Sequence, residues 1–137
     1  MIDKVGLLTI RDARVLLCRK KRGTSLLILP GGKREAGETS LECLARELHE
    51  ELGDVTAVSP ELIDVYTYEA AGAKGKMVRI ELYRADLMGE PQAQSEIGEL
   101  VWFGPGDNPA MLAPSLNCLI FPDLTRRGIW KPDMLSY

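Results

Sequence analysis

The sequence has few of the residues that build disulfide-rich, zinc-binding or membrane proteins. Its three cysteines, Cys18, Cys43 and Cys118, lie far apart, with no C-x-x-C spacing. This spacing argues against a disulfide framework or a zinc site and fits reduced thiols in a cytosolic protein. No apolar run approaches the roughly 20 residues that span a bilayer. The first ten residues, MIDKVGLLTI, become charged too soon for a signal peptide. We therefore expect a cytoplasmic protein that makes no contact with membranes.

The chain also lacks an excess of positive charge. Seventeen Lys and Arg against 20 Asp and Glu give a net charge of −3, so no general basic field exists to attract nucleic acid. An anionic small molecule would need a metal ion and a few local cations. The 137 residues contain no repeat, low-complexity tract or linker. We expect a single domain over residues 1–137, large enough to bury a core without disulfide bonds or structural metal ions.

Residues 39–53 are predicted to form a capped helix. Thr39 and Glu42 have the spacing of a capping box, and Gly53 is a stop signal. The apolar residues recur at helical spacing and predict one buried stripe. This stripe comprises Leu41, Leu44, Ala45, Leu48 and Leu52.

The same helix carries a cluster of carboxylates. We expect Glu47, Glu50 and Glu51 to share a second face, roughly 120° from the apolar stripe. Like charges at these spacings cost roughly 0.2–0.5 kcal/mol a pair, and a hard cation such as Mg²⁺ would turn the repulsion into attraction. The alternative is a solvated acidic face. Upstream, the pair Gly31-Gly32 would let a backbone carbonyl join the metal shell, or it is an ordinary turn.

Together these residues carry a family resemblance. The segment from Gly32 to Asp54 resembles the Nudix box, Gly-x5-Glu-x7-Arg-Glu-U-x-Glu-Glu-x-Gly-U, in which U is a bulky aliphatic residue. The matching residues are Gly32, Glu38, Arg46, Glu47, Leu48, Glu50, Glu51 and Gly53. Asp54 departs from the last aliphatic place, which is mainly a packing position.

The resemblance implies a fold, a chemistry and a role for each matching residue. The fold would be an α/β/α sandwich with a mixed sheet. Glu50 and Glu51 would be the main ligands of Mg²⁺, or of Mn²⁺, with Glu47 as ligand or base. Arg46 would orient a carboxylate, and the Gly31 carbonyl would contact the metal. Gly32, Glu38 and Gly53 would support the geometry of the loop and helix.

The remaining pattern predicts a mixture of strands and one further helix. Strand-like runs cover residues 5–10, 14–19, 26–29, 55–58, 62–68, 77–87 and 100–103, and a final helix is predicted over 115–127. Mixed strands with two helices agree with the fold that the resemblance implies.

Further candidate site residues lie outside the box. Members of the family often place a glutamate before the last strand as ligand or base, so Glu96 is the first choice and Glu99 the second; the alternative is solvated loop glutamates. One or two residues of the basic run Arg19, Lys20, Lys21 and Arg22 are candidates for binding phosphate, with Arg19 preferred, or the run is a solvated turn. Lys33 and Gly32 are further candidates for binding substrate, and Arg79 and Arg84 for lining the pocket. MutT-like members place an asparagine near Asn117 to bind a purine edge, although helix capping explains it equally well. Four aromatic residues could stack on a base, but core packing is the expected role of each: Trp102, Trp130, Tyr66 and Tyr68. His49 is expected at the surface.

The resemblance implies hydrolysis of a diphosphate bond in a nucleoside di- or triphosphate, including oxidised or non-standard nucleotides. The products would be a nucleoside monophosphate and pyrophosphate or phosphate. Alternatives are 5′ trimming of RNA, and hydrolysis of ADP-ribose or dinucleoside polyphosphates. Ala70 stands where ADP-ribose-cleaving members carry proline, and Tyr68 is only near the tyrosine place of diadenosine-polyphosphate members. A nucleotide-sensing module without turnover is a third class, and assembly as a homodimer stays open.

Overall fold

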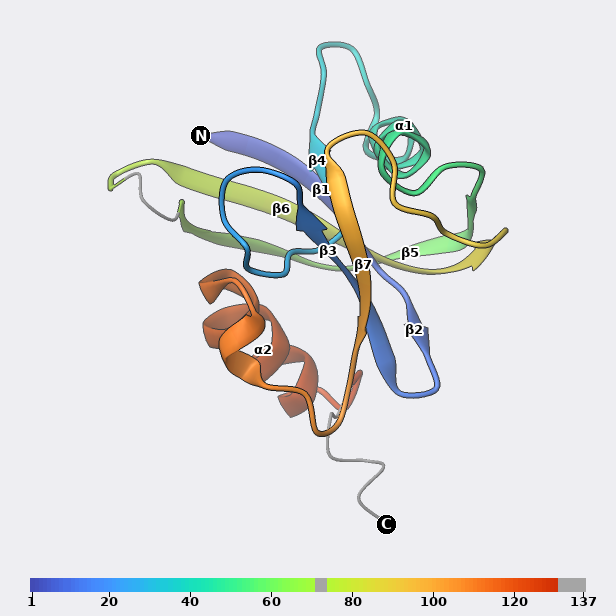
Figure 1. Ribbon diagram of the computed structural model, residues 1–137. Helices are drawn as coiled ribbons and strands as arrows, with labels where there is room; N and C mark the ends of the chain where they lie inside the picture. Colours follow the sequence, from blue (N-terminus) through green and yellow to red (C-terminus); the bar gives the residue numbers. More distant parts are fainter. Residues whose placement is uncertain (71–73, 131–137) are drawn as a thin grey trace.

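The computed structural model describes residues 1–70 and 74–130 (Figure 1). Its strands are β1 (Ile2–Leu8), β2 (Ile10–Arg11), β3 (Arg14–Lys20), β4 (Gly31–Lys33), β5 (Thr56–Glu69), β6 (Met77–Met88) and β7 (Ile97–Phe103). Its helices are α1 (Ser40–Leu52), η1 (Pro109–Met111), the π-helical turn η2 (Leu116–Ile120) and α2 (Phe121–Arg126). No helix within the described residues is long and apolar enough to cross a membrane.

The strands form a four-stranded and a three-stranded sheet. The first has the order β4-β1-β6-β5 and the second the order β2-β3-β7. Strand β1 pairs antiparallel with β4 and parallel with β6, so the larger sheet is mixed. Lys4 is aligned with Lys33 on one side and with Ile80 on the other. The backbone of β1 is therefore fixed from both edges.

Two apolar cores lie on opposite sides of the strands. Helix α1 packs Leu44, Leu48 and Leu52 against Val5 and Leu7 of β1. On the other side, η2 and α2 pack against a second set of strand residues. That set includes Leu8, Leu17, Ile80 and Leu82. Figure 1 shows the two helical layers with the strands between them, so the predicted α/β/α architecture is confirmed.

Side chains of the central strands point alternately to the two faces of the sheet. On β1, Val5 and Leu7 belong to the core under α1, whereas Leu8 belongs to the core under α2. On β6, Ile80 and Leu82 also belong to the core under α2. A strand alternates with a period of two, so the even-numbered Lys4 falls on the face away from α1.

Helix α1 confirms its predicted caps but corrects two predictions about its faces. The Thr39 hydroxyl accepts from the Glu42 backbone N–H, the Glu42 carboxylate accepts from the Thr39 N–H, and Gly53 ends the helix. Leu41 (48% exposed) and Ala45 are exposed and not part of the buried stripe, because the buried face is centred near Leu44 and these two residues fall at its edge. The predicted separation of Glu51 from the apolar stripe is wrong, because Glu51 is only 4% exposed. Glu51 follows Leu44 by seven residues, two helical turns, and therefore points almost the same way.

Three other boundaries differ from the prediction. Residues 26–29 are not a strand but make isolated bridges, Cys18 to Ile28 and Leu27 to Leu112. The runs 55–58 and 62–68 are one strand, β5, which bulges around Ser59 rather than ending there. The final helix begins as the π-turn η2, in which Phe121 N–H bonds to the Leu116 carbonyl five residues back. Pro122 follows and has no N–H for a regular helical bond.

Candidate active site

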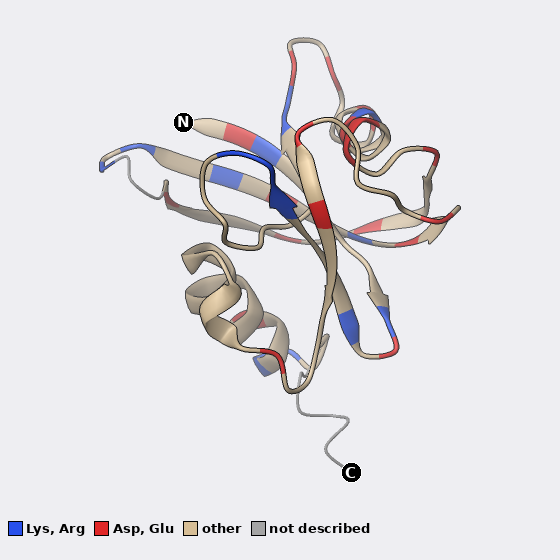
Figure 2. Cartoon of the chain, viewed as in Figure 1, with Lys and Arg blue, Asp and Glu red and all other residues tan. Residues whose placement is uncertain are grey.

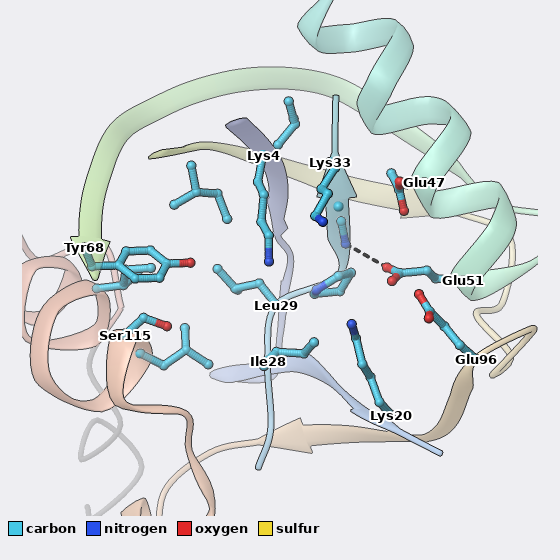
Figure 3. Close-up of a pocket in the computed structure, with 17 residues that line it drawn as sticks. Lys4, Lys20, Ile28, Leu29, Lys33, Glu47, Glu51, Tyr68, Glu96 and Ser115 are labelled. Carbon is cyan, nitrogen blue, oxygen red and sulfur yellow. Dashed lines mark hydrogen bonds between the residues drawn. The ribbon is translucent and has the colours of Figure 1, made fainter. Parts of the chain in front are cut away.

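A cavity of about 360 Å³ opens on the face of the larger sheet away from α1's core, and charged side chains converge on it (Figure 3). We call it the charged cavity. Its charged residues are Lys4 of β1, Lys20 of β3, Lys33 of β4, Glu47 and Glu51 of α1, and Glu96 just before β7. Figure 2 shows how the acidic residues of α1 lie across from the basic residues that end β3.

Glu51 is the most deeply placed carboxylate of the charged cavity. One of its oxygens accepts the Gly31 backbone N–H at 2.7 Å. Burial raises the pKa of Glu51 to about 7, and the charges of Glu47 and Glu96 act in the same direction against the Gly31 hydrogen bond. Burial likewise raises the pKa of Glu47, opposed by Arg46. The three carboxylates therefore repel each other, and a cation between them would be attracted.

The glycine pair brings the backbone close to these carboxylates. Gly31 has a φ of +133°, and a Cβ there would lie 2.1 Å from the Val5 carbonyl oxygen. A Cβ on Gly32 would lie 2.5 Å from the carboxyl carbon of Glu47. Only glycine fits at either position. The structure brings the Gly31 N–H onto Glu51, a contact that the sequence did not reveal.

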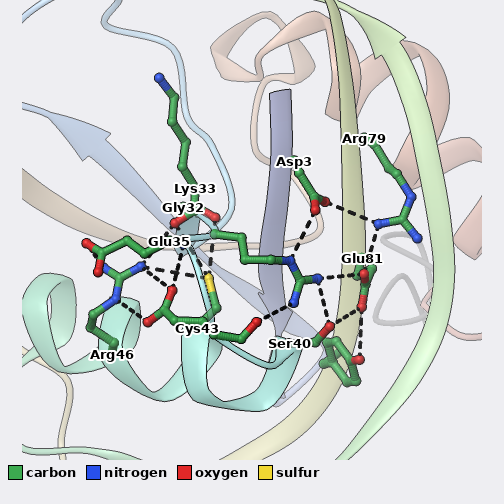
Figure 4. Close-up of polar contacts among 12 residues, drawn as sticks. Asp3, Gly32, Lys33, Glu35, Ser40, Cys43, Arg46, Arg79 and Glu81 are labelled. Carbon is green, nitrogen blue, oxygen red and sulfur yellow. Dashed lines mark hydrogen bonds and ion pairs between the residues drawn. The ribbon is translucent and has the colours of Figure 1, made fainter. Parts of the chain in front are cut away.

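Arg46 ties the loop before α1 to the helix. Its Nε and NH2 groups donate to the two oxygens of Glu38 at 2.6 and 2.9 Å, and its NH2 also donates to the Lys33 carbonyl at 3.0 Å (Figure 4). Its NH1 donates to Glu47 at 3.0 Å. The Arg46 hydrogen bonds lower the pKa of Glu38 to about 2. This placement agrees with the roles that the resemblance implies for Arg46 and Glu38.

Four residues expected to bind metal or substrate do not line the charged cavity: Glu50, Arg19, Glu99 and Asn117. The Glu50 side chain is 51% exposed and accepts from Arg46 NH1 at 3.3 Å. Arg19 donates to Glu99 and to the Ser25 carbonyl, because β3 and β7 align these residues as neighbours. Asn117 lines a different cavity, beside Phe121 and Pro122. It is one residue past Leu116, about 100° around the helix from the face that meets the charged cavity.

Lys4 is a site residue that sequence reasoning missed. Lys20, which also lines the charged cavity, belongs to the basic run of residues 19–22, in which Arg19 was the preferred candidate. The alternation of residues 2–8 was the available signal for Lys4, because it separates Lys4 from Val5 and Leu7. The pKa of Lys4 is lowered, first by burial and then by Lys20 and Lys33. Within residues 1–70 and 74–130, no carboxylate oxygen lies within 4.0 Å of Lys4, Lys20 or Lys33 Nζ.

A second polar cluster lies on the opposite face of the sheet, beside the start of α1 (Figure 4). The Glu81 carboxylate accepts from Ser40 at 2.6 Å, Arg34 at 2.8 Å, Arg79 at 2.9 Å and Tyr83 at 3.1 Å. Arg79 is thus a partner of Glu81. Neither Arg79 nor the exposed Arg84 lines the charged cavity.

The donor set of the charged cavity suits a hard divalent cation bound together with a ligand. In the described part of the chain, no three His, Cys, Asp or Glu side chains stand close enough to hold a metal by themselves. Mg²⁺ commonly uses only one or two carboxylates and completes its shell with water and substrate phosphate. Glu47, Glu51 and Glu96 supply such carboxylates, and repulsion among them would be relieved by the ion.

Comparison with known proteins decides the family. Residues 2–120 match the family model described as NUDIX domain. The chain belongs to the Nudix hydrolase family. The crystal structure of a MutT Nudix hydrolase from Burkholderia pseudomallei is similar, with a TM-score of 0.72 and 30% identity over 82% of this chain and 89% of that one. The solution structure of the E. coli ORF135 protein has a TM-score of 0.74 and 29% identity, over 94% and 92% of the two chains.

The two curated relatives are longer proteins, and only part of each matches this Nudix domain. An ADP-ribose pyrophosphatase from Methanocaldococcus jannaschii is 29% identical over 103 residues, 74% of this chain and 60% of that protein. The Nudix hydrolase YvcI of Bacillus subtilis, itself uncharacterised, is 29% identical over 70% of this chain and 61% of its own length. The chain therefore spans about three fifths of these two relatives.

Proposed function

We propose that this Nudix domain hydrolyses a diphosphate bond in a nucleoside di- or triphosphate, using Mg²⁺ or Mn²⁺. The observation that carries the proposal is the charged cavity, where three carboxylates face three lysines that have no carboxylate partner among the described residues. Metal-binding carboxylates and free ammonium groups are the two kinds of group that hold a diphosphate from opposite sides.

The carboxylates would hold the metal. Glu51 uses one oxygen for the Gly31 N–H and keeps its other oxygen for the ion, while Glu47 and Glu96 face the same space (Figure 3). The bound ion would supply charge neutralisation at the phosphoryl oxygens and a lower pKa for the attacking water. We assign Gly31 a supporting role, since its N–H fixes the Glu51 carboxylate.

Glu50 is retained as a further metal ligand on the strength of the resemblance. Its carboxylate is half exposed and is held by one 3.3 Å contact from Arg46. Rotation of the side chain toward the charged cavity would break only that contact. An exposed ion pair of this kind contributes only about 0–1 kcal/mol to stability. Glu51, by contrast, is fixed by burial and by the Gly31 N–H.

Proton transfer from the attacking water requires one carboxylate as general base. Glu47 and Glu96 are our candidates, since both line the charged cavity and Arg46 holds Glu47 in place. The charges of Glu47 and Glu51 act on each other, so a pH profile reports the pair rather than one residue. Lys20 and Lys33 would bind the phosphate oxygens on the opposite side.

ADP-ribose is a second candidate substrate. The specific observation in its favour is the 29% identity to a relative named ADP-ribose pyrophosphatase. A nucleoside triphosphate and ADP-ribose both present a diphosphate to the same carboxylates and lysines. The two candidates differ in what lies beyond that diphosphate, a third phosphate or a second ribose.

A hydrolysis screen tests the proposal. Purified protein with Mg²⁺ or Mn²⁺ is incubated with standard and oxidised nucleoside triphosphates, ADP-ribose, dinucleoside polyphosphates and 5′-triphosphate RNA, and released phosphate and pyrophosphate are measured. Glu51→Gln keeps the shape of the side chain and should be inactive. Glu61→Gln, the same substitution at an exposed position of β5, is the matched control and should stay active. Hydrolysis of one class that Glu51→Gln loses supports the proposal; binding without turnover across the panel would indicate a sensor module instead.

A further inference from the structure

The end of the charged cavity away from the carboxylates carries the hydroxyls of Tyr68 of β5 and Ser115 before η2. Lys4 of β1 extends into the cavity between these hydroxyls and the carboxylates (Figure 3). The three donors come from three segments that are far apart in the sequence and converge only in the fold.

Among the described residues, Lys4 has no ion-pair partner, so its ammonium group is available to bind a ligand. Its side chain is partly buried, and its pKa is lowered by burial and then by its neighbours Lys20 and Lys33. The part of the chain that the structure describes offers no carboxylate within 4.0 Å of its Nζ atom. A partly desolvated charge without a partner is unfavourable. An oxygen acceptor on a bound ligand would supply the missing partner.

The surroundings of Lys4 indicate what carries that acceptor. Ile80, Leu116 and Ile120 supply apolar wall beside the three donors. Burial raises the pKa of Tyr68, and the Ser115 hydroxyl opposes that rise, so both hydroxyls stay protonated near neutral pH. Apolar walls with a few placed donors suit a flat heterocycle with oxygen on its edge.

We propose that Lys4 is a specificity-determining residue that selects nucleotides whose base presents a keto oxygen, such as guanine, hypoxanthine or uracil, over adenine. Lysine binds the O6 and N7 atoms of guanine in proteins that recognise bases. Adenine instead presents an amino donor at the corresponding edge, which would face the ammonium group, a group that can only donate hydrogen bonds. This proposal rests on the proposed function only in that a nucleotide occupies the charged cavity.

Binding without metal tests the proposal apart from hydrolysis. GMP, IMP and AMP are titrated into the protein in EDTA by calorimetry or NMR. IMP differs from AMP essentially by the keto oxygen. GMP and IMP should bind roughly tenfold to a hundredfold more tightly than AMP, the range of a charged hydrogen bond. Lys4→Met, which keeps the length of the side chain, should remove that preference, and Lys4→Arg should retain it.

Lys33→Met is the matched control, because Lys33 is the neighbour of Lys4 across the β1–β4 pair and would bind only phosphate. It should weaken all three nucleotides by the same factor. Equal binding of IMP and AMP to the wild type, no measurable binding of any of the three, or a preference unchanged in Lys4→Met would each overturn the proposal. Loss of hydrolysis with the preference intact would count against the proposed function alone.

Discussion

Gly32 lies directly against Glu47, and the space between them has no room for a methyl group. A Cβ on Gly32 would be 2.5 Å from the carboxyl carbon of Glu47 and 2.5–2.6 Å from both of its oxygens. The contact joins β4 to α1 at the charged cavity. The backbone of Gly32, unlike that of Gly31, has an ordinary negative φ, so the requirement for glycine is one of space and not of conformation.

Gly32→Ala should therefore displace the Glu47 carboxylate while the fold persists. We expect a loss of hydrolysis of roughly 100-fold, the scale of one misplaced catalytic group, with a melting temperature within a few degrees of the wild type. Gly98→Ala on β7 is the control, because its nearest neighbour is the flexible Lys21 side chain at 3.2 Å. Full activity in Gly32→Ala would show that the position of Glu47 does not matter to the reaction.

The protonation of Glu51 should give both stability and metal binding a dependence on pH. Its pKa is raised from 4.5 in the unfolded chain to about 7 in the folded protein, mainly by burial. Between these values the folded state binds more protons, so metal-free stability falls as the pH rises through this window. Urea titrations at pH 5.5 and 8 should show the fall in the wild type and a smaller one in Glu51→Gln.

Metal should reverse that trend, because Mg²⁺ binds the deprotonated carboxylate. We expect Mg²⁺ to raise the melting temperature more at pH 8 than at pH 5.5, and hydrolysis to increase as the pH rises toward about 7. Glu51→Gln should lower kcat by at least about 100-fold, since a lost metal ligand removes several kcal/mol of transition-state stabilisation. A metal effect independent of pH would exclude Glu51 as a ligand.

Glu81 should be a determinant of stability outside the cavity. It is 9% exposed and accepts four hydrogen bonds, two of them from arginines. Removing one partner of such a buried group typically costs roughly 3–5 kcal/mol, so Glu81→Ala should lower the free energy of unfolding by about 3 kcal/mol. Glu61→Ala, at an exposed position of β5, should change it by less than about 0.5 kcal/mol. Denaturant titration of both variants measures the difference.

Arg46→Lys should separate charge from geometry. Lysine keeps the positive charge but cannot donate to both Glu38 oxygens, to Glu47 and to the Lys33 carbonyl at once. We expect kcat to fall by roughly 10- to 100-fold, the usual effect of losing a group that orients metal ligands. Arg126→Lys, on the exposed end of α2, should retain full activity. An unchanged kcat in Arg46→Lys would show that charge alone suffices.

Local sequence signals predicted those parts of the structure that depend on neighbours in the chain. The capping box at Thr39 and the end of α1 at Gly53 depend on residues fewer than 15 positions apart. Glu47, Glu51 and Lys33, which line the charged cavity, come from the same segment. The burial of Glu51 could also have been predicted, because Glu51 follows the buried Leu44 by seven residues and points almost the same way.

Local sequence signals could not predict features that depend on the pairing of distant strands. Lys4 and Lys20 enter the charged cavity because β1 and β3 lie beside β4 and α1, which no local pattern shows. The four donors of Glu81 come from residues 34, 40, 79 and 83, which only the fold brings together. Asn117 was misplaced because the π-turn and Pro122 set which face of the last helical segment meets the strands.

The pairing of β1 with both β4 and β6 makes the charged cavity a late product of folding. Lys4 is aligned with Lys33, 29 residues away, and with Ile80, 76 residues away, and contacts between such distant residues form slowly. On the ribosome, α1 with all its glutamates is synthesised before β6. A growing chain at that stage has the whole Nudix box but no enclosed place for a nucleotide, so nucleotide binding reports that β6 has joined β1.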